Sequence, residues 1–269
     1  MHDNERAATD RPVVTAGDWP VRRGRRGVHE EARDRRWLQW IGRFRFVTVD
    51  LLALRFGVSV QQARARVRRL EGEGLVVAVR AHVSEPKAIY LSPKGARAIG
   101  RRPRRKAPRA AVQREHELAV VELAAGLELA AHPGVEVLSE RDCQGREADG
   151  LGRFSIDVLD DRGQSGRRWP DLIVCQGDRR VAIEIEFATK AASRLASIVA
   201  SYLASELAEV RFLVASPALA ARLARITTIE RGRLANRRIS TNVALSIAPW
   251  QHAPESVYAA IVRSAGAYG

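Results

Sequence analysis

The sequence predicts a mixed α/β protein built from two modules, and three observations lead to this fold class. Residues 31–100 alternate amphipathic helix signals with one short hairpin. Residues 111–250 place short β-branched runs between helix signals, in the order α-β-β-β-α-β. Residues 1–110 hold 26 Lys and Arg against 11 Asp and Glu, whereas residues 111–269 hold 19 against 20. The net charge of +14 therefore belongs to the first 110 residues.

Composition limits the classes of protein to which this chain can belong. A chain of 269 residues suits about two domains, and 46% hydrophobic residues can fill a core. No run approaches the roughly 20 apolar residues of a membrane span, and the start of the chain lacks an apolar signal segment, so we expect a cytoplasmic protein without a membrane partner. Cys143 and Cys175 form no CxxC pair and are expected to be reduced thiols.

The first module begins after residues 1–28, a polar stretch with RRGRRG at 22–27 that predicts a disordered basic arm. Helices are expected over 33–43 and over 48–56, the second ending near Gly57. Ser59 opens a third helix, with Gln62 completing a capping box. A helical wheel turns Val60, Ala63, Val67 and Leu70 inward and Ala65 outward.

Two strands, 75–80 and 88–91, are expected next, with a polar tip between them. Ser92-Pro93 then opens a fourth helix. Through LLALRFGVSVQQARARVRRLEGEGLV and YLSPKG, residues 30–100 resemble winged helix-turn-helix DNA-binding domains. The resemblance implies that the third helix enters the major groove of double-stranded DNA. The DNA-binding residues expected there are Gln61, Gln62 and Ala65 on base edges, and Arg64, Arg68, Arg69 and Lys87 on phosphates. An ordinary solvated arginine-rich face is the alternative.

Residues 101–110 read as a linker, because RRPRRKAPR combines helix-blocking prolines with six cations. The second module, 111–269, is expected to have a helix over 112–131, a strand over 135–139, a polar loop over 142–153 and an optional strand over 154–159. A hairpin over 169–188, a helix over 190–207 and a strand over 211–215 follow. The expected elements beyond these are a helix near 217–230, a strand near 243–248 and a helix near 254–264.

The hairpin is the most informative segment. Two apolar runs flank Gly177-Asp178, and glycine at the first turn position suits a two-residue type II′ loop. This turn places Asp171 opposite Glu184. Asp171, Glu184 and Glu186 then share one face, while Leu172, Val174, Val181, Ile183, Ile185 and Phe187 share the other. Carboxylates about 5 Å apart repel unless a cation lies between them, so the pattern indicates a hairpin built around a divalent metal ion, or descended from one that was. The alternative is that these acids lie on the solvated face of a half-buried sheet and bind no metal.

An αβββαβ core with such a hairpin resembles the PD-(D/E)xK fold of restriction-endonuclease-like proteins, through Pro170-Asp171 and Glu184-Ile185-Glu186. The resemblance implies that Asp171 and Glu184 bind Mg or Mn. It also implies a catalytic Lys two residues after Glu184, but Glu186 stands there, and Lys190 is the nearest ammonium. A cation near a helix N-terminus is unfavourable, so Lys190 is expected to reach back to Glu186 or to a phosphate. The candidate catalytic set is Asp171, Glu184, Glu186 and Lys190.

The whole arrangement also resembles the replication-relaxation family. The matching residues are Glu115-His116-Glu117-Leu118, Ser139-Glu140-Arg141, the WPDLIV and IEIEFATK segments, and Tyr202. The resemblance spans residues 30–215 and implies replication control, mobilisation or transcription on a plasmid, phage or integrative element. His116 is read as an interior packing residue in preference to a site residue.

Two hypotheses follow. The first is a DNA-binding protein whose nuclease-like second module is non-catalytic and serves in a homodimer or in contact with a protein partner from a mobile element. The second is a Mg- or Mn-dependent DNA endonuclease that the first module delivers to DNA. Glu186 in place of Lys favours the first. The sequence shows no P-loop and no GxSxG, so nucleotide hydrolysis and serine chemistry have no support.

Overall fold

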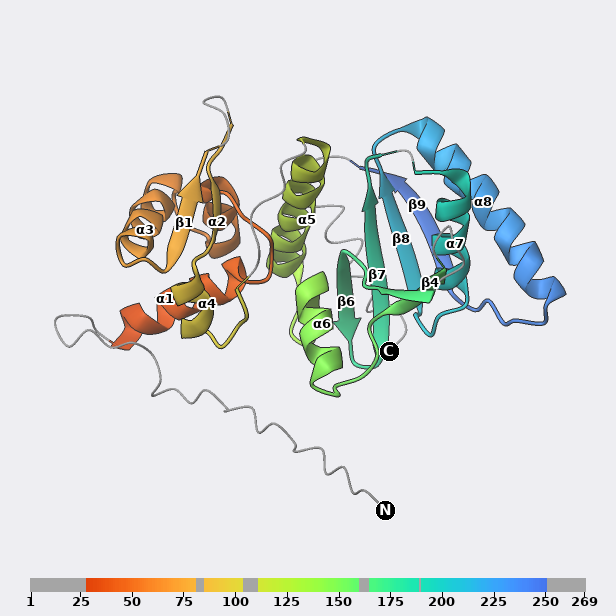
Figure 1. Ribbon diagram of the computed structural model, residues 1–269, viewed down its shortest axis with the longest axis horizontal. Helices are drawn as coiled ribbons and strands as arrows, with labels where there is room; N and C mark the ends of the chain where they lie inside the picture. The colour runs from red at the N-terminus through yellow and green to blue at the C-terminus, as the bar shows by residue number, and fades with distance from the viewer. Residues whose placement is uncertain (1–27, 81–84, 104–110, 160–164, 189, 251–269) are drawn as a thin grey trace, which may run out of the picture.

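The computed structural model describes residues 28–80, 85–103, 111–159, 165–188 and 190–250. This part of the chain is mixed α/β, as predicted, with helices gathered at the N-terminal end and around a twisted sheet (Figure 1). The predicted basic arm, the hairpin tip at 81–84, most of the linker and the helix near 254–264 lie outside the described residues.

The N-terminal elements follow the predicted order. They are α1 (Val28–Ile41), α2 (Val49–Phe56), α3 (Val60–Gly72), β1 (Val76–Val79), β2 (Ala88–Leu91) and α4 (Pro93–Ala98). Thr48, Ser59 and Ser92 cap their helices, and Ser59 with Gln62 forms the predicted capping box. The expected inward face of α3 needs one correction. Ala63, Val67 and Leu70 are buried, but Val60, the first residue of α3, is 36% exposed.

The second part is organised around a five-stranded sheet. Its elements are α5 (Ala111–Ala130), β3 (Val135–Ser139), α6 (Glu140–Ala148), β4 (Ile156–Leu159), β5 (Ser165–Arg168), β6 (Leu172–Gln176), β7 (Arg179–Glu186), α7 (Ala192–Leu203), β8 (Glu209–Val214), α8 (Pro217–Asn236) and β9 (Ala244–Pro249). The sheet order is β3-β6-β7-β8-β9. Pairs along β3-β6-β7 are antiparallel and those along β7-β8-β9 are parallel. β4 and β5 form a separate antiparallel pair.

Two of these elements differ from the expectation. Residues 142–153 were predicted as a loop, but α6 runs to Ala148, started by a capping box between Ser139 and Asp142. β5 was not expected, because its sequence SGRR has no apolar alternation; backbone pairing with β4 forms it nonetheless. Lys190 also lies just before α7, whereas the sequence placed it inside the helix.

The register of the β6–β7 hairpin is confirmed. Leu172 faces Ile183 and Gln176 faces Arg179, so the next position beyond β6 brings Asp171 level with Glu184. Gly177 has φ +54°, and Arg238 is the one non-glycine residue with positive φ among those described. Asp178 therefore does not have the positive φ that a type I′ turn requires, which agrees with the predicted type II′ turn.

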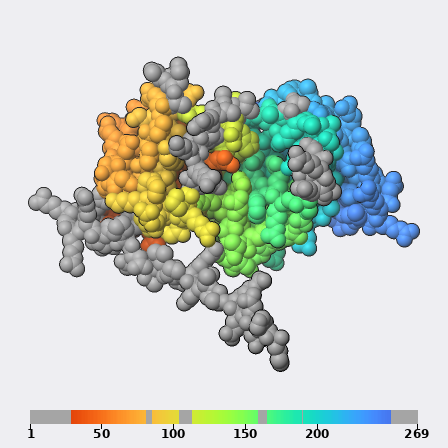
Figure 2. Space-filling view, in the orientation of Figure 1, coloured from red at the N-terminus to blue at the C-terminus, as the bar shows by residue number. Residues whose placement is uncertain are grey.

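The hydrophobic core is continuous between the two parts. One cluster of buried side chains joins Trp37 and Leu52 of the N-terminal helices to Leu123 of α5 and Val174 and Ile183 of the sheet. A second cluster lies on the other face of the sheet, under α7 and α8. α5 separates the N-terminal helices from the sheet in Figure 1, and the surfaces of the two parts meet in Figure 2. α5 is therefore covered on both sides.

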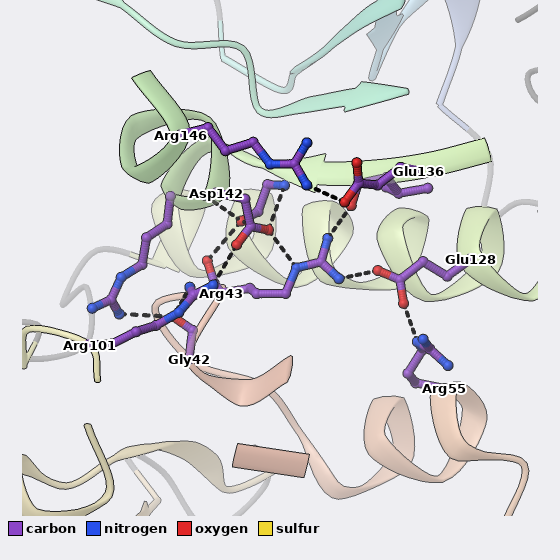
Figure 3. Close-up of polar contacts among 11 residues, drawn as sticks. Gly42, Arg43, Arg55, Arg101, Glu128, Glu136, Asp142 and Arg146 are labelled. Carbon is purple, nitrogen blue, oxygen red and sulfur yellow. Dashed lines mark hydrogen bonds and ion pairs between the residues drawn. The ribbon is translucent and has the colours of Figure 1, made fainter. Parts of the chain in front are cut away.

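A partly buried charge network reinforces this junction beside the core (Figure 3). Arg43, which follows α1, donates to Asp142 at 2.6 Å, to the Val137 carbonyl at 2.5 Å and to Glu128. Glu128 also accepts from Arg55, and Asp142 also accepts from Arg101. Arg43 thus links the N-terminal helices to α5, β3 and α6 through one side chain.

Replacing Arg43 tests the importance of this junction. Arg43→Met removes a buried cation between two carboxylates, and we expect the free energy of unfolding to fall by about 2–4 kcal/mol in urea titrations followed by circular dichroism. The matched control is Arg45→Met, since Arg45 is 41% exposed and pairs with Glu117 at 2.8 Å. Its expected cost is about 0–1 kcal/mol. Equal costs for the two variants would show that Arg43 contributes no more than a surface pair.

Candidate functional site

The three acidic side chains of the hairpin lie where the register predicts. Asp171 directly precedes β6, and Glu184 and Glu186 lie on β7 with their side chains on the same face. Glu184 is 2% exposed and Glu186 is 5% exposed. The alternative of a solvated sheet face is therefore wrong. Buried carboxylates need compensating charge or hydrogen bonds, and their partners decide what the site can do.

Glu184 is held from two sides. Arg168, the last residue of β5, donates to Glu184 Oε2 at 2.5 Å, and the buried Tyr202 hydroxyl of α7 donates to Glu184 Oε1. Burial raises the pKa of Glu184 and Asp171 raises it further, against the lowering effect of Arg168. Burial also raises the pKa of Tyr202 well above its usual value, so the phenol stays protonated as a donor. Both oxygens of Glu184 are thus engaged by protein donors.

Asp171 is held by α5. His116 Nε2 lies 3.1 Å from Asp171 Oδ2, and the Ile185 amide donates to the same oxygen at 2.8 Å. Burial works to lower the pKa of His116, but the hydrogen bond to Asp171 and the charge of that carboxylate outweigh it and raise the pKa to about 9. The same contact lowers the pKa of Asp171 despite the opposing effect of burial. The pair is therefore charged at neutral pH.

Lys190 reaches back to Glu186, as the sequence predicted. The Lys190 ammonium is partly exposed, whereas the carboxylate of Glu186 is buried. Asp171, Glu184 and Glu186 consequently face three cationic groups, one each from α5, β5 and the segment before α7. All three cations are side chains of the protein itself.

The arrangement does not fit a divalent cation as it stands. Among the described residues, no group of three or more His, Cys, Asp or Glu side chains is placed to hold a metal ion. A cation shared by Asp171 and Glu184 would have to displace Arg168 or Tyr202, because these two groups bind both carboxylate oxygens of Glu184. Binding of Mg or Mn at Asp171 and Glu184 stays a prediction.

The residues predicted to bind DNA divide into a group that is exposed and a group that has structural partners within the protein. Gln61, Arg64, Ala65 and Arg68 are exposed on α3, and Lys87 is exposed just before β2. Arg64, Arg68, Lys87 and Arg80 line one cavity of about 360 Å³ between α3 and the hairpin.

Gln62 and Arg69 have structural partners. Gln62 Oε1 accepts from the Ser59 amide at 2.9 Å in the capping box. Arg69 pairs with Asp34 and Glu30 of α1. Asp34 is fully buried, and its Oδ1 also forms an ion pair with Arg66 Nη1 at 3.0 Å. These contacts attach α3 to α1.

Several site residues were missed from the sequence. Arg168 lies in a polar segment without a motif, and nothing in the sequence indicated that it would meet Glu184. His116 was expected to be a packing residue, yet it contacts Asp171 and lies edge-on to Phe187 at 6.3 Å between ring centroids. Its signal was available in the Glu-His-Glu segment at 115–117. Tyr202 was expected to face inward, and it does.

Comparison with protein families identifies the chain. The replication-relaxation family matches residues 38–210, a span that begins in α1 and ends in β8. The chain therefore belongs to the replication-relaxation family, and membership suggests a role in the replication of mobile elements. None of the curated proteins matches this chain, and none of the solved structures does.

The length and composition of the helices show whether any of them could cross a membrane. Within the described ranges, no helix combines the length and the apolar character that crossing a bilayer requires.

The contact between His116 and Asp171 predicts a pH dependence of stability. An unfolded histidine has a pKa of about 6.5, so a folded pKa of about 9 stabilises the protein fully below pH 6.5, and this contribution is lost as the pH rises through 9. His116→Gln removes the charge but keeps an amide donor. We expect the stability difference between the natural protein and this variant to be about 1–3 kcal/mol larger at pH 6 than at pH 10 in urea titrations. A difference independent of pH would show that the pKa of His116 is the same in the folded and unfolded protein, and a smaller difference at pH 6 than at pH 10 would show that folding keeps His116 neutral.

Proposed function

We propose that this protein binds double-stranded DNA of a plasmid, phage or integrative element and acts there in replication control, mobilisation or transcription. In this proposal α1–α4 and the β1–β2 hairpin form a winged helix-turn-helix domain, with α3 reading the major groove. The second part, which resembles PD-(D/E)xK nucleases, serves as a non-catalytic body for dimerisation or partner contact.

One observation carries the proposal. The outward face of α3 presents short polar and small side chains, Gln61 and Ala65, beside two cations, Arg64 and Arg68. Gln can pair with an adenine edge, an Ala methyl can contact a thymine methyl, and Arg can hold phosphates. Lys87 and Arg80 of the hairpin line the same cavity as the two arginines, so four cations face the two carboxylates of that cavity, Asp50 and Glu71, and leave a net positive charge.

The carboxylate site supports a structural role for the second part. Phosphodiester cleavage with a metal needs a cation that activates water and offsets the charge of the phosphate. Here Arg168 and His116 already neutralise the carboxylates, and Lys190 is paired with the acid that stands at the lysine position. These three ion pairs join α5, β5 and the segment before α7 to the central strands.

Substitutions on α3 test the DNA-binding proposal. Once random-site selection has given a preferred duplex, we expect Arg68→Ala to weaken binding to all duplexes alike, by several-fold at moderate salt, because it removes a phosphate contact. Gln61→Ala is expected to cost about 1–3 kcal/mol on the preferred site and little elsewhere, which relaxes specificity.

Arg225→Ala on α8 is the matched control, since it removes an exposed arginine far from α3. Mobility shifts with the full chain give the affinities. If Gln61→Ala and Arg68→Ala behave like this control, α3 is not the reading element. If the natural protein binds no duplex at all, the proposed function is wrong.

A Mg- or Mn-dependent endonuclease is the second candidate, and the convergence of Asp171 and Glu184 on one face favours it. Nicking of a supercoiled plasmid with and without Mn²⁺ distinguishes the two functions. We expect no nicking above that of an Asp171→Asn/Glu184→Gln variant, which keeps the shapes of both side chains. Mn²⁺-dependent nicking that this variant abolishes would establish the endonuclease instead.

A further inference from the structure

A second cationic cavity lies on the other flank of α3. It has a volume of about 500 Å³, and its charged lining consists of Arg33 and Arg36 of α1 with Arg66 and Arg69 of α3. Gln62 and Ala65 complete its edge toward the outward face of α3. The cavity with Arg64, Arg68, Arg80 and Lys87 lies on the opposite side of Ala65. α3 is therefore flanked by basic residues on both sides.

The charges in the α1–α3 cavity are only partly balanced. Arg66 and Arg69 pair with Asp34, and Arg69 also pairs with Glu30. Arg33 and Arg36 are exposed, and neither makes an ion pair within the described residues. Burial lowers the pKa of Arg66, and the nearby charge of Arg33 lowers it further, despite the raising effect of Asp34. Crowded cations of this kind favour an anionic ligand.

Two packed aromatic rings, Trp37 and Phe56, belong to the lining of the cavity. The rings of Trp37 and Phe56 stack with centroids 4.5 Å apart, and the Arg66 guanidinium lies 5.2 Å from the Trp37 ring centroid. Trp37 is 2% exposed, so the ring is covered and its role is packing. These contacts pack α1 against α2 and α3, so the part of α1 that carries Arg33 and Arg36 lies beside α3.

We propose that the α1–α3 cavity is a second phosphate-binding site, which holds the DNA strand opposite to the one bound by Arg64, Arg68 and Lys87. The inference rests on the proposed function. The major groove is about 12 Å wide and admits one α-helix between the two phosphate backbones. Cations on both flanks of α3 therefore meet phosphates of different strands. A single strand follows one flank only, so this site makes the protein selective for duplex DNA.

The test compares two double variants with the same loss of charge. Arg33→Gln/Arg36→Gln removes the exposed pair of the cavity, and Arg222→Gln/Arg225→Gln removes two arginines from α8 as the control. Affinity of the full-length chain is measured by fluorescence anisotropy for a duplex of about two helical turns and for one of its strands, over a range of salt concentrations.

We expect the cavity variant to bind the duplex on the order of tenfold more weakly than the control at moderate salt. The slope of log K against log salt should become shallower by about 2, because two phosphate contacts are lost. Binding of the single strand should match that of the control. Duplex affinity equal to the control, or an equal loss on duplex and single strand, would overturn the second site.

Two further measurements distinguish a failure of this inference from a failure of the proposed function, and a DNA phosphate from a free anion. If Arg68→Gln weakens duplex binding and Arg33→Gln/Arg36→Gln does not, the proposed function stands and this inference fails. If the natural protein binds no duplex, both fail. Inorganic phosphate replacing chloride at constant ionic strength probes a free anion. A rise in melting temperature that the cavity variant abolishes, without a change in duplex affinity, would assign the cavity to a small anion instead.

Discussion

Neutralisation of buried carboxylates is the constraint on which the arrangement of this protein depends. Glu184 is paired with Arg168, Asp171 with His116, and Asp142 with Arg43 and Arg101. In each case the acid and the base come from different elements of the chain. A buried charge without its partner is costly, so each pair fixes the relative position of the elements that supply it. The apolar clusters provide the driving force for folding, and the ion pairs restrict how the elements can be arranged.

The carboxylate site and the surface around α3 differ in how far their charges are balanced. In the carboxylate site, acids and bases occur in equal number and bind each other. On α3 and its neighbours, several arginines and a lysine remain exposed, and the available acids, such as Asp34, are used to attach α3 to α1. The exposed cations on and around α3 agree with the excess of basic residues in the first 110 positions.

Much of the fold could be predicted from local sequence. The caps Thr48, Ser59 and Ser92, and the type II′ turn at Gly177, are short-range signals that determine where elements begin and how β6 and β7 align. Strand β5 could not be predicted, because its formation depends on pairing with β4 and not on its own residues. α6 could have been found from the Ser139–Asp142 capping box, a signal that the polar composition of the segment obscured.

The candidate site was predictable in its three acids and in Lys190, but not in the two other bases, Arg168 and His116. The hairpin register places Asp171, Glu184 and Glu186 together, since alternation along a strand is a local rule. Arg168 and His116 reach them through tertiary contacts that no spacing in the sequence encodes. The sequence therefore indicated that cations were needed beside these acids, and the structure showed that Arg168 and His116 supply two of them.

The position of α5 inside a single core has a geometric consequence. Because α5 is packed against the N-terminal helices on one side and the sheet on the other, the far end of the molecule at α8 and β9 keeps a constant direction relative to α3 (Figure 1). If α3 follows the major groove, that direction rotates with the helical phase of the DNA. Two copies on neighbouring sites would then meet, or fail to meet, according to the number of base pairs between them, with a period of one helical turn.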